Sequence, residues 1–197
     1  MKSQFIIGLV CLFTVIRSTD GAAENLTITL HASDYEIIAE NERDVIVMPQ
    51  FGSTTVPGEP QLPSKTFLIA VPPAAVVHSV DITPAQIRTL KGQYHIKPNA
   101  PVITGVIDQD RASMVQTAEQ NFRERYQSVY NSPRMYPETP GKYLGQGRWR
   151  KYSYIRVQFT PFQFQPQSGE LIAYASCDVS INYTSPTPNS QAWRSYV

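Results

Sequence analysis

The 197-residue sequence has little cysteine, little charge and no apolar run long enough to span a membrane. Its two cysteines are Cys11 and Cys177, and Cys11 lies in an apolar N-terminal stretch that we expect to be removed. The single cysteine that remains cannot form a disulfide within the chain. The formal net charge is +1, whereas a nucleic-acid partner requires a strongly basic face. These scarcities exclude a disulfide scaffold and argue against nucleic-acid binding.

Catalytic and metal-binding motifs are also missing. The sequence contains no Gly-x-Ser-x-Gly elbow, and none of its three histidines has another histidine, cysteine or carboxylate at the spacing of a zinc or iron site. Cys177 is in phase with Val179 and Ile181 on the apolar face of a predicted strand, which indicates a buried structural thiol. We therefore predict no catalytic residue, no metal site and no cofactor. A hydrolase that uses Cys177 remains an alternative.

The N-terminus has the pattern of a secretory signal peptide. Lys2 precedes the apolar run from Phe5 to Ile16, and small residues end at Ala23. The run is shorter than the ~20 residues of a membrane span, so we expect cleavage after Ala23 and no stable membrane insertion afterwards. The predicted organisation is a signal peptide at 1–23, one domain at 24–184 and a linker-like tail at 185–197. The mature protein is expected to be secreted or periplasmic.

Alternating apolar residues predict a chain made mainly of strands. In the last part of the chain Ile155, Val157 and Phe159 face one way, and a second apolar face runs from Leu171 to Ile181. Further strands are predicted at 26–30, 45–48, 66–71 and 76–82, where Val76, His78, Val80 and Ile82 share one face. Strands with one apolar face, joined by turns, predict an antiparallel, jelly-roll-like β-sandwich.

One segment has the period of a helix instead. Apolar and aromatic residues recur every four positions between Ser113 and Tyr130, and Ser113 is a plausible cap. We predict a single helical insertion there. The segments on either side, from Pro98 to Arg111 and from Asn131 to Gly147, are rich in proline, glycine and polar residues and are predicted to be loops.

Basic residues are concentrated between Arg111 and Lys151, a segment that contains eight lysines and arginines but only three glutamates. One interpretation is a solvated helix face with strand-edge cations that discourage aggregation. The other is a surface that docks an acidic partner through basic and aromatic side chains. The candidates for such docking are Arg123, Arg125, Arg134, Tyr136 and Trp149.

The most distinctive motif is the turn Pro57-Gly58-Glu59-Pro60-Gln61-Leu62-Pro63, which leads into Ile69-Ala70-Val71-Pro72. Three prolines around one glycine fix a rigid turn, and the apolar run indicates a buried strand. A late block follows from Val157 to Pro166 and continues through Gly169-Glu170-Leu171. In this order and at this spacing the motifs resemble the propeptide domain of gingipain-type cysteine peptidases, from about Leu26 to Tyr183.

The resemblance implies a β-sandwich that assists the folding of a peptidase and keeps it latent by placing a loop in its cleft. Such a chain is not itself an enzyme, and its partner is a cysteine peptidase domain in cis or in trans. The corresponding loop is Pro98 to Arg111, where Gly105 occupies the expected basic tip and the first arginine is Arg111; the inhibitory-loop candidates are Gly105, Asp108, Asp110 and Arg111. We expect the sequence to be the N-terminal part of a longer precursor or a free-standing inhibitor.

An alternative from another class is a secreted β-sandwich module that binds carbohydrate or cell-surface ligands. Tyr143, Trp149, Tyr152 and Tyr154 could stack on sugar rings, although alternating aromatic residues are also common in sheet packing.

Overall fold

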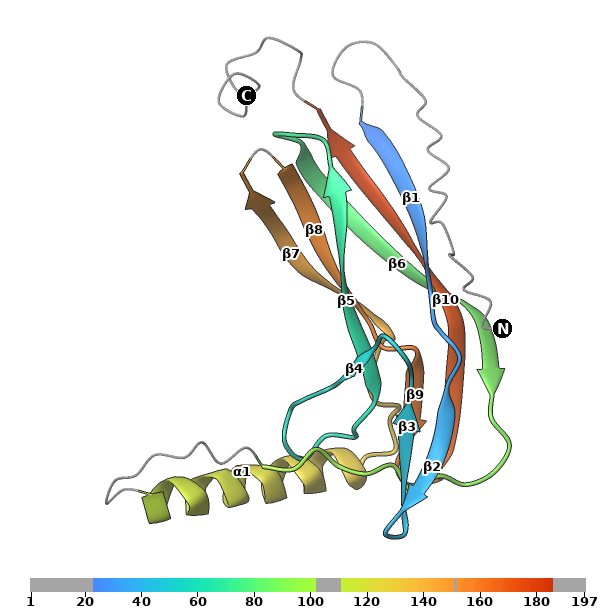
Figure 1. The fold of residues 1–197 in the computed structure, drawn as a ribbon, viewed down its shortest axis with the longest axis vertical. Coiled ribbons are helices and arrows are strands. Elements are labelled where there is room, and N and C mark those ends of the chain that lie inside the picture. Colours follow the sequence, from blue (N-terminus) through green and yellow to red (C-terminus); the bar gives the residue numbers. More distant parts are fainter. Residues whose placement is uncertain (1–22, 102–110, 151, 186–197) are drawn as a thin grey trace, which may run out of the picture.

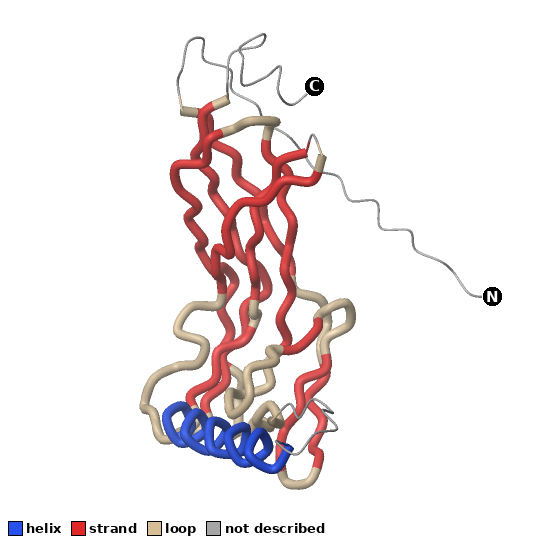
Figure 2. The backbone as a smooth tube through the Cα atoms, turned by 90° about the vertical axis from the view of Figure 1, so that its left-hand side faces the viewer, coloured by secondary structure: helices blue, strands red, loops and turns tan. Residues whose placement is uncertain are grey.

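The computed structural model describes residues 23–101, 111–150 and 152–185, and it has the predicted β-sandwich architecture. Two antiparallel sheets run side by side along the long axis, and a helix lies across one end (Figures 1 and 2). The first sheet has the order β1-β10-β6, with β9 also paired to β10, and the second has the order β4-β5-β8-β7. The bounds of the first sheet are β1 Glu24–His31, β6 Val76–Thr89, β9 Phe162–Gln165 and β10 Glu170–Thr184. Those of the second are β4 Gly52–Ser53, β5 Pro63–Val71, β7 Gly141–Trp149 and β8 Tyr152–Phe159.

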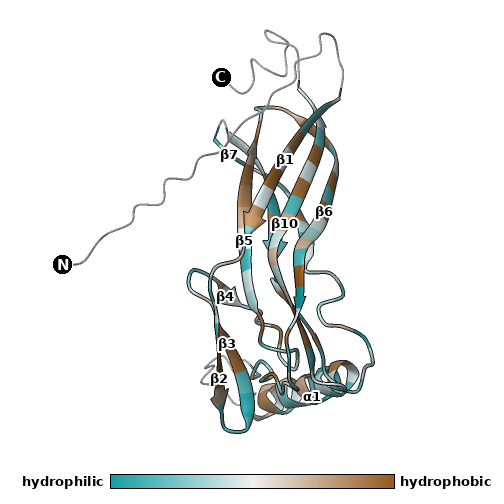
Figure 3. Cartoon of the chain, turned by 90° about the vertical axis from the view of Figure 1, so that its right-hand side faces the viewer, coloured by the Kyte–Doolittle hydropathy of each residue, from teal (hydrophilic) through white to brown (hydrophobic). Residues whose placement is uncertain are grey.

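The remaining elements lie at the end that we call the helix end. They are the hairpin of β2 (Glu36–Glu40) and β3 (Arg43–Val47) and the helix α1 (Arg111–Tyr130). The predicted helix therefore exists and begins two residues before the expected start at Ser113. Figure 3 shows hydrophobic and hydrophilic residues following one another along β1, β6 and β10, and it also shows the β2–β3 hairpin beside the helix. No helix in the described part of the chain is long and apolar enough to cross a membrane.

The core lies between the inner faces of the two sheets. Ile155, Val157 and Phe159 of β8 are fully buried, as are Cys177, Val179 and Ile181 of β10, which confirms the alternation predicted for β8 and for this part of β10. Around Ala175 the prediction was wrong, because Ala175 is exposed while Tyr174 and Ser176 are buried. A second cluster fills the helix end around Leu62, Ile96, Phe162, Phe164 and Leu171. Each fully buried side chain of this size contributes about 1.5–3 kcal/mol, so packing alone stabilises a fold without disulfides.

The predicted face of β6 was partly wrong: Val80 and Ile82 pack against the core as expected, but Val76 and His78 do not. Its register against β10 shifts between Asn182 and Tyr183, so one extra residue of β6 is accommodated at that point. As a result Val77 and Val80 pack against the core, while Val76 and His78 are exposed. His78 shares a hydrogen bond of 3.1 Å with the Thr184 hydroxyl. A β-bulge of this kind reverses which side chains face inward, and strict alternation cannot reveal it.

The loop predicted from Asn131 to Gly147 was also partly wrong, because β7 begins at Gly141. Its glycines, which suggested a loop, are needed for close contacts. A Cβ on Gly141 would lie 2.2 Å from Cγ2 of Ile82, where the two sheets meet, and one on Gly147 would lie 2.6 Å from the Tyr154 ring. The segment 161–169, which joins β8 to β10, contains the short strand β9.

Cys177 is fully buried, as predicted, and burial, followed by the neighbouring Asp178, raises the pKa of its thiol to about 11. The unfolded chain ionises this thiol at its ordinary pKa of 9.0, whereas the folded chain keeps the proton. The stability of the fold should therefore fall as the pH rises from about 9 to 11, by up to about 2–3 kcal/mol. Denaturant melts at pH 8 and pH 11 measure this loss. It should be smaller in Cys177→Ala, and an equal loss in both proteins would contradict the assignment.

Candidate functional site at the helix end

Helix α1 is docked on the turn that the sequence singles out. Gly58 has a φ of +82°, and an added Cβ would lie 2.7 Å from the Phe122 carbonyl oxygen and 2.8 Å from the Tyr126 backbone nitrogen. The backbone of the turn and the backbone of the helix are therefore in direct contact. Only glycine combines this conformation with this approach at no steric cost.

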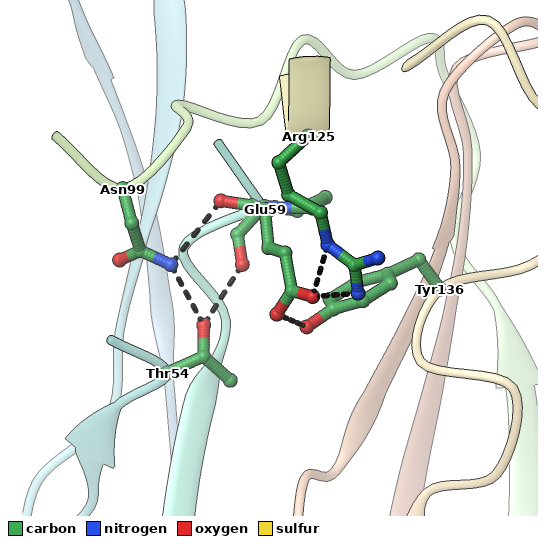
Figure 4. A network of polar contacts seen from close by, with 6 residues as sticks. Thr54, Glu59, Asn99, Arg125 and Tyr136 are labelled. Carbon is green, nitrogen blue, oxygen red and sulfur yellow. Dashed lines mark hydrogen bonds and ion pairs between the residues drawn. The ribbon is translucent and has the colours of Figure 1, made fainter. Parts of the chain in front are cut away.

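The next residue, Glu59, is a buried carboxylate at the centre of a polar network (Figure 4). Its Oε1 accepts hydrogen bonds from Nε of Arg125, at 2.7 Å, and from Nη2 of the same guanidinium. Its Oε2 accepts a hydrogen bond from the Tyr136 hydroxyl. Burial, followed by the hydrogen bond to Glu59, raises the pKa of Tyr136 well above its usual range, so the hydroxyl keeps the proton that it donates. We call Thr54, Glu59, Asn99, Arg125 and Tyr136 the Glu59 network.

Asn99 joins the segment before residue 102 to the same turn. Its backbone N–H donates to the Glu59 carbonyl at 2.8 Å, its Nδ2 donates to the same carbonyl at 3.1 Å, and its own carbonyl accepts from the Gly58 N–H at 3.0 Å. Nδ2 also donates to the Thr54 hydroxyl, 3.3 Å away. The chain on one side of residues 102–110 is thus fixed to the turn through Asn99, and the chain on the other side is fixed through α1.

An aromatic series holds the second half of the helix. The rings of Phe122, Tyr126 and Tyr130 stack at centroid distances of 6.0 and 4.3 Å, and Tyr130 meets Phe164 edge-on at 6.3 Å. The Tyr130 hydroxyl donates to the Ile96 carbonyl at 2.8 Å. The first half of α1 is largely exposed, and Met114 retains 46% of its accessible surface. The four-residue period therefore reflects docking of the C-terminal half of α1.

Beside the Glu59 network lies a groove with a volume of about 800 Å³. Its walls are the segment Ser53 to Val56, the C-terminal half of α1 and the segment Ser132 to Pro140. Lys142, Gln158 and Thr160 contribute from the second sheet. Arg134 and Lys142 are exposed in this groove, and neither forms one of the ion pairs found among the described residues. The groove is therefore rich in hydroxyl groups and carries two cations without a carboxylate partner in the described structure.

The predicted docking residues divide into three groups. Arg125, Arg134 and Tyr136 meet at the groove. Arg123 is exposed on α1 and lies 3.8 Å from Glu119, whereas Trp149 ends β7 at the opposite end of the second sheet (Figure 1). Among the loop candidates, Gly105, Asp108 and Asp110 lie outside the described residues, and Arg111 is the first residue of α1.

The sequence analysis did not identify the two hydrogen-bond acceptors at the centre of the Glu59 network, which are the side-chain carboxylate and the backbone carbonyl of Glu59. The available signal was a charged residue inside a rigid turn, because a carboxylate buried between Gly58 and Pro60 requires hydrogen-bond donors from elsewhere in the chain. Within the described ranges, no group of three or more histidine, cysteine or carboxylate side chains could hold a metal ion.

Comparisons with known proteins agree with this architecture. Two solved structures from Porphyromonas gingivalis are similar in fold. One is a complex of the RgpB pro- and mature domains, with a TM-score of 0.56 and 15% identity over 90% of this chain and 88% of that chain. The other, which concerns the zymogenic latency of gingipain K, has a TM-score of 0.55 and 12% identity over 92% and 97% of the two chains. No curated protein sequence matches.

A match to a family model shows which family the chain belongs to, whereas the two solved structures show only a similar fold. The Propeptide_C25 model matches residues 15–196, which is most of the chain and includes the turn, the helix and both sheets. The chain therefore belongs to the Propeptide_C25 family, whose propeptides keep gingipain-type cysteine peptidases latent.

Proposed function

We propose that this propeptide holds its peptidase latent through the helix end. The observation that supports this most directly is the attachment of both flanks of residues 102–110 to one turn, through Asn99 on one side and Arg125 of α1 on the other. A segment with fixed ends loses less conformational entropy on binding than a free one. The Glu59 network thus prepares the segment from Pro98 to Arg111 for insertion into the cleft of the peptidase.

Within this proposal the residues have different roles. Arg125 and Tyr136 position the helix, because Glu59 already occupies their polar groups. Arg134 and Lys142 contact the peptidase, since their charges lie exposed in the groove. Gly105, Asp108, Asp110 and Arg111 are the candidates for the residue that enters the cleft. If Arg111 has this role, the cleft accepts a basic side chain.

We also propose that the chain reaches its partner by export. Propeptides of this family belong to precursors of secreted peptidases. Residues 1–22 and 186–197 lie outside the described residues, so cleavage after Ala23 and the linker-like tail stay predictions from the sequence.

Charge reversal in the groove tests the docking role. The double variant Arg134→Glu/Lys142→Glu should weaken inhibition of a gingipain-type peptidase by about 10- to 100-fold. Each new carboxylate would face those groups of the peptidase that contact a cation in the wild-type complex. Inhibition constants of the full chain are measured against a panel of mature peptidases that includes the cognate enzyme.

The matched control is Arg88→Glu/Lys91→Glu, which makes the same change of net charge at two exposed positions outside the groove. Equal weakening by both double variants would show that only the net charge matters and would overturn the docking role of the groove. A wild-type chain that inhibits no member of the panel would overturn the proposed function itself.

A further inference from the structure

The two sheets carry charges of opposite sign. The strands of the second sheet contain four cations and no carboxylate: Lys65, Lys142, Arg148 and Arg156. The strands of the first sheet contain four carboxylates, Glu24, Asp81, Glu170 and Asp178, and the single cation Arg88, apart from two histidines. Moreover, the sequence from Thr139 to Gly169 has no aspartate or glutamate. On the outer faces this leaves Lys142 and Arg156 on the second sheet and Asp81 and Asp178 on the first, because Lys65 and Arg148 pair with the buried residues Phe159 and Ser153.

The outer face of the first sheet is suited to water. Its side chains are mostly hydroxyls and amides that hydrogen-bond across strands: Asn25 to Asn182 at 2.8 Å, Thr27 to Ser180 at 3.2 Å, and Thr29 to Asp178 at 2.6 Å. Asn182 also donates to Ser79 at 2.8 Å. These polar groups satisfy one another, and the central part of this face has no large exposed apolar side chain.

The outer face of the second sheet is different. Its pairing places Trp149 opposite Tyr152, Tyr154 between Gly147 and Ala70, and Arg156 between Gly145 and Leu68. Trp149, Leu68 and Tyr152 retain 71%, 66% and 60% of their accessible surface. The Tyr154 ring lies over Gly147, where a Cβ would be 2.6 Å from it. We call Leu68, Trp149, Tyr152, Tyr154 and Arg156, together with Lys142 and Gln158, the basic sheet face.

This face is continuous with the groove at the helix end, because Lys142 and Gln158 belong to both. Helix α1 lies across the end of the sandwich and leaves the face uncovered along its length (Figures 1 and 2). The eight residues of β8 extend over roughly 26 Å. A stable interface requires about 800 Å² from each partner, which is more than a short inserted segment offers. A partner docked at the groove could reach this area by continuing along the sheet.

We propose that the peptidase also rests on the basic sheet face, with Trp149, Tyr152 and Leu68 as apolar contacts and with carboxylates on the peptidase opposite Arg156 and Lys142. This inference rests on the proposed function and names the second surface through which it acts. Tryptophan, tyrosine and arginine are the residues that dominate binding energy at protein interfaces. The cations accelerate encounter with an acidic surface, and the aromatic side chains slow dissociation.

The test measures binding separately from inhibition. The partner is the mature peptidase that the wild-type chain inhibits, with its catalytic cysteine replaced so that neither protein is cleaved. Trp149→Ala and Tyr152→Ala, made together in the full chain, should raise Kd about 10- to 100-fold, mainly through faster dissociation. Arg156→Glu should slow association and flatten its dependence on salt concentration. Arg156 also donates a hydrogen bond to the Leu144 carbonyl at 2.9 Å, so thermal melts of each variant establish that the fold is retained at the assay temperature.

The chain offers a closely matched control for the apolar contacts. Leu68 and Ile87 are exposed to nearly the same extent, 66% and 64%, but lie on opposite sheets. Leu68→Ala should weaken binding several-fold, and Ile87→Ala should leave Kd unchanged. Equal Kd values for the wild type and the Trp149→Ala/Tyr152→Ala variant would overturn this inference and leave the proposed function intact.

Two further outcomes would also decide the question. If the double aromatic variant keeps its affinity for the peptidase but loses binding to vesicles of phosphatidylglycerol, the face serves an anionic lipid surface and the inference is wrong. A corresponding loss on a glycan array would assign the face to carbohydrate, with the same consequence. Failure of the wild type to bind any peptidase would remove both this inference and the proposed function.

Discussion

Gly58→Ala should detach helix α1 from the turn and reduce inhibition at least tenfold. The new methyl group would lie 2.7 and 2.8 Å from backbone atoms of Phe122 and Tyr126, and backbone cannot rotate away as a side chain can. The positive φ of +82° adds about 1–2 kcal/mol for a residue with a Cβ. The helix then carries its end of the segment Pro98 to Arg111 out of position. Inhibition constants and thermal melts of the full chain measure both effects.

Gly52→Ala is the control for this substitution. Gly52 does not have a positive φ, and its added Cβ would lie 3.6 Å from the Ser64 carbonyl oxygen, an ordinary van der Waals contact. This variant should melt and inhibit like the wild type. If Gly58→Ala behaves in the same way, the turn and the helix do not act as one unit. The proposal that the Glu59 network pre-organises residues 98–111 for binding would then be wrong.

Arg125→Met should destabilise the fold by about 2–3 kcal/mol, because it leaves the Glu59 carboxylate buried with only one side-chain donor, Tyr136. Glu59 has a side-chain exposure of 6%, and Arg125 one of 49%, so the cost arises mainly at the carboxylate. We expect inhibition to weaken in parallel, since the helix loses its polar attachment. Denaturant titration gives the free energy of unfolding, and the peptidase assay gives the effect on latency.

A second substitution separates the buried charge from lost packing. In Glu59→Gln/Arg125→Met the buried group is neutral and can still accept the Tyr136 hydrogen bond, so the double variant should be about 1–2 kcal/mol more stable than Arg125→Met alone. Arg123→Met removes an exposed ion pair with Glu119 on the same helix and should cost less than about 0.5 kcal/mol. A double variant that is less stable than Arg125→Met would show that the charge is not the cause.

The strands with regular alternation could be predicted from the sequence, and those with special contacts could not. In β8, and in β10 from Cys177 to Ile181, the inward residues follow a period of two, and the structure confirms them. Around Ala175 the alternation in β10 is reversed, because Ala175 is exposed while Tyr174 and Ser176 are buried. In β6 the bulge reverses the faces near Val76 and His78. In β7 the glycines look like loop residues, although Gly141 and Gly147 are required by Ile82 and Tyr154. Such contacts depend on which strands become neighbours.

The candidate site was partly predictable for a similar reason. The docking candidates included Arg134, Tyr136 and Arg125, all of which line the groove, but the guanidinium of Arg125 hydrogen-bonds the buried Glu59. Their role in docking stays a prediction. A list of cations cannot show which one has a buried partner. Trp149 was named with the same group, yet it lies on the basic sheet face, because β7 carries it to the other end of the sandwich.

The order of strands in the two sheets has a consequence for the integrity of the propeptide when its chain is cut. Strands β1 and β6 precede residue 102 and pair with β10, and β5 pairs with β8. Each sheet therefore contains strands from both sides of the segment 102–110. If the chain is cut in this segment, neither of the two fragments holds a complete sheet. A single cut in this segment breaks one covalent bond but leaves every described strand pairing in place. A nicked propeptide would thus remain one folded body, and its removal from the peptidase requires more than that first cleavage.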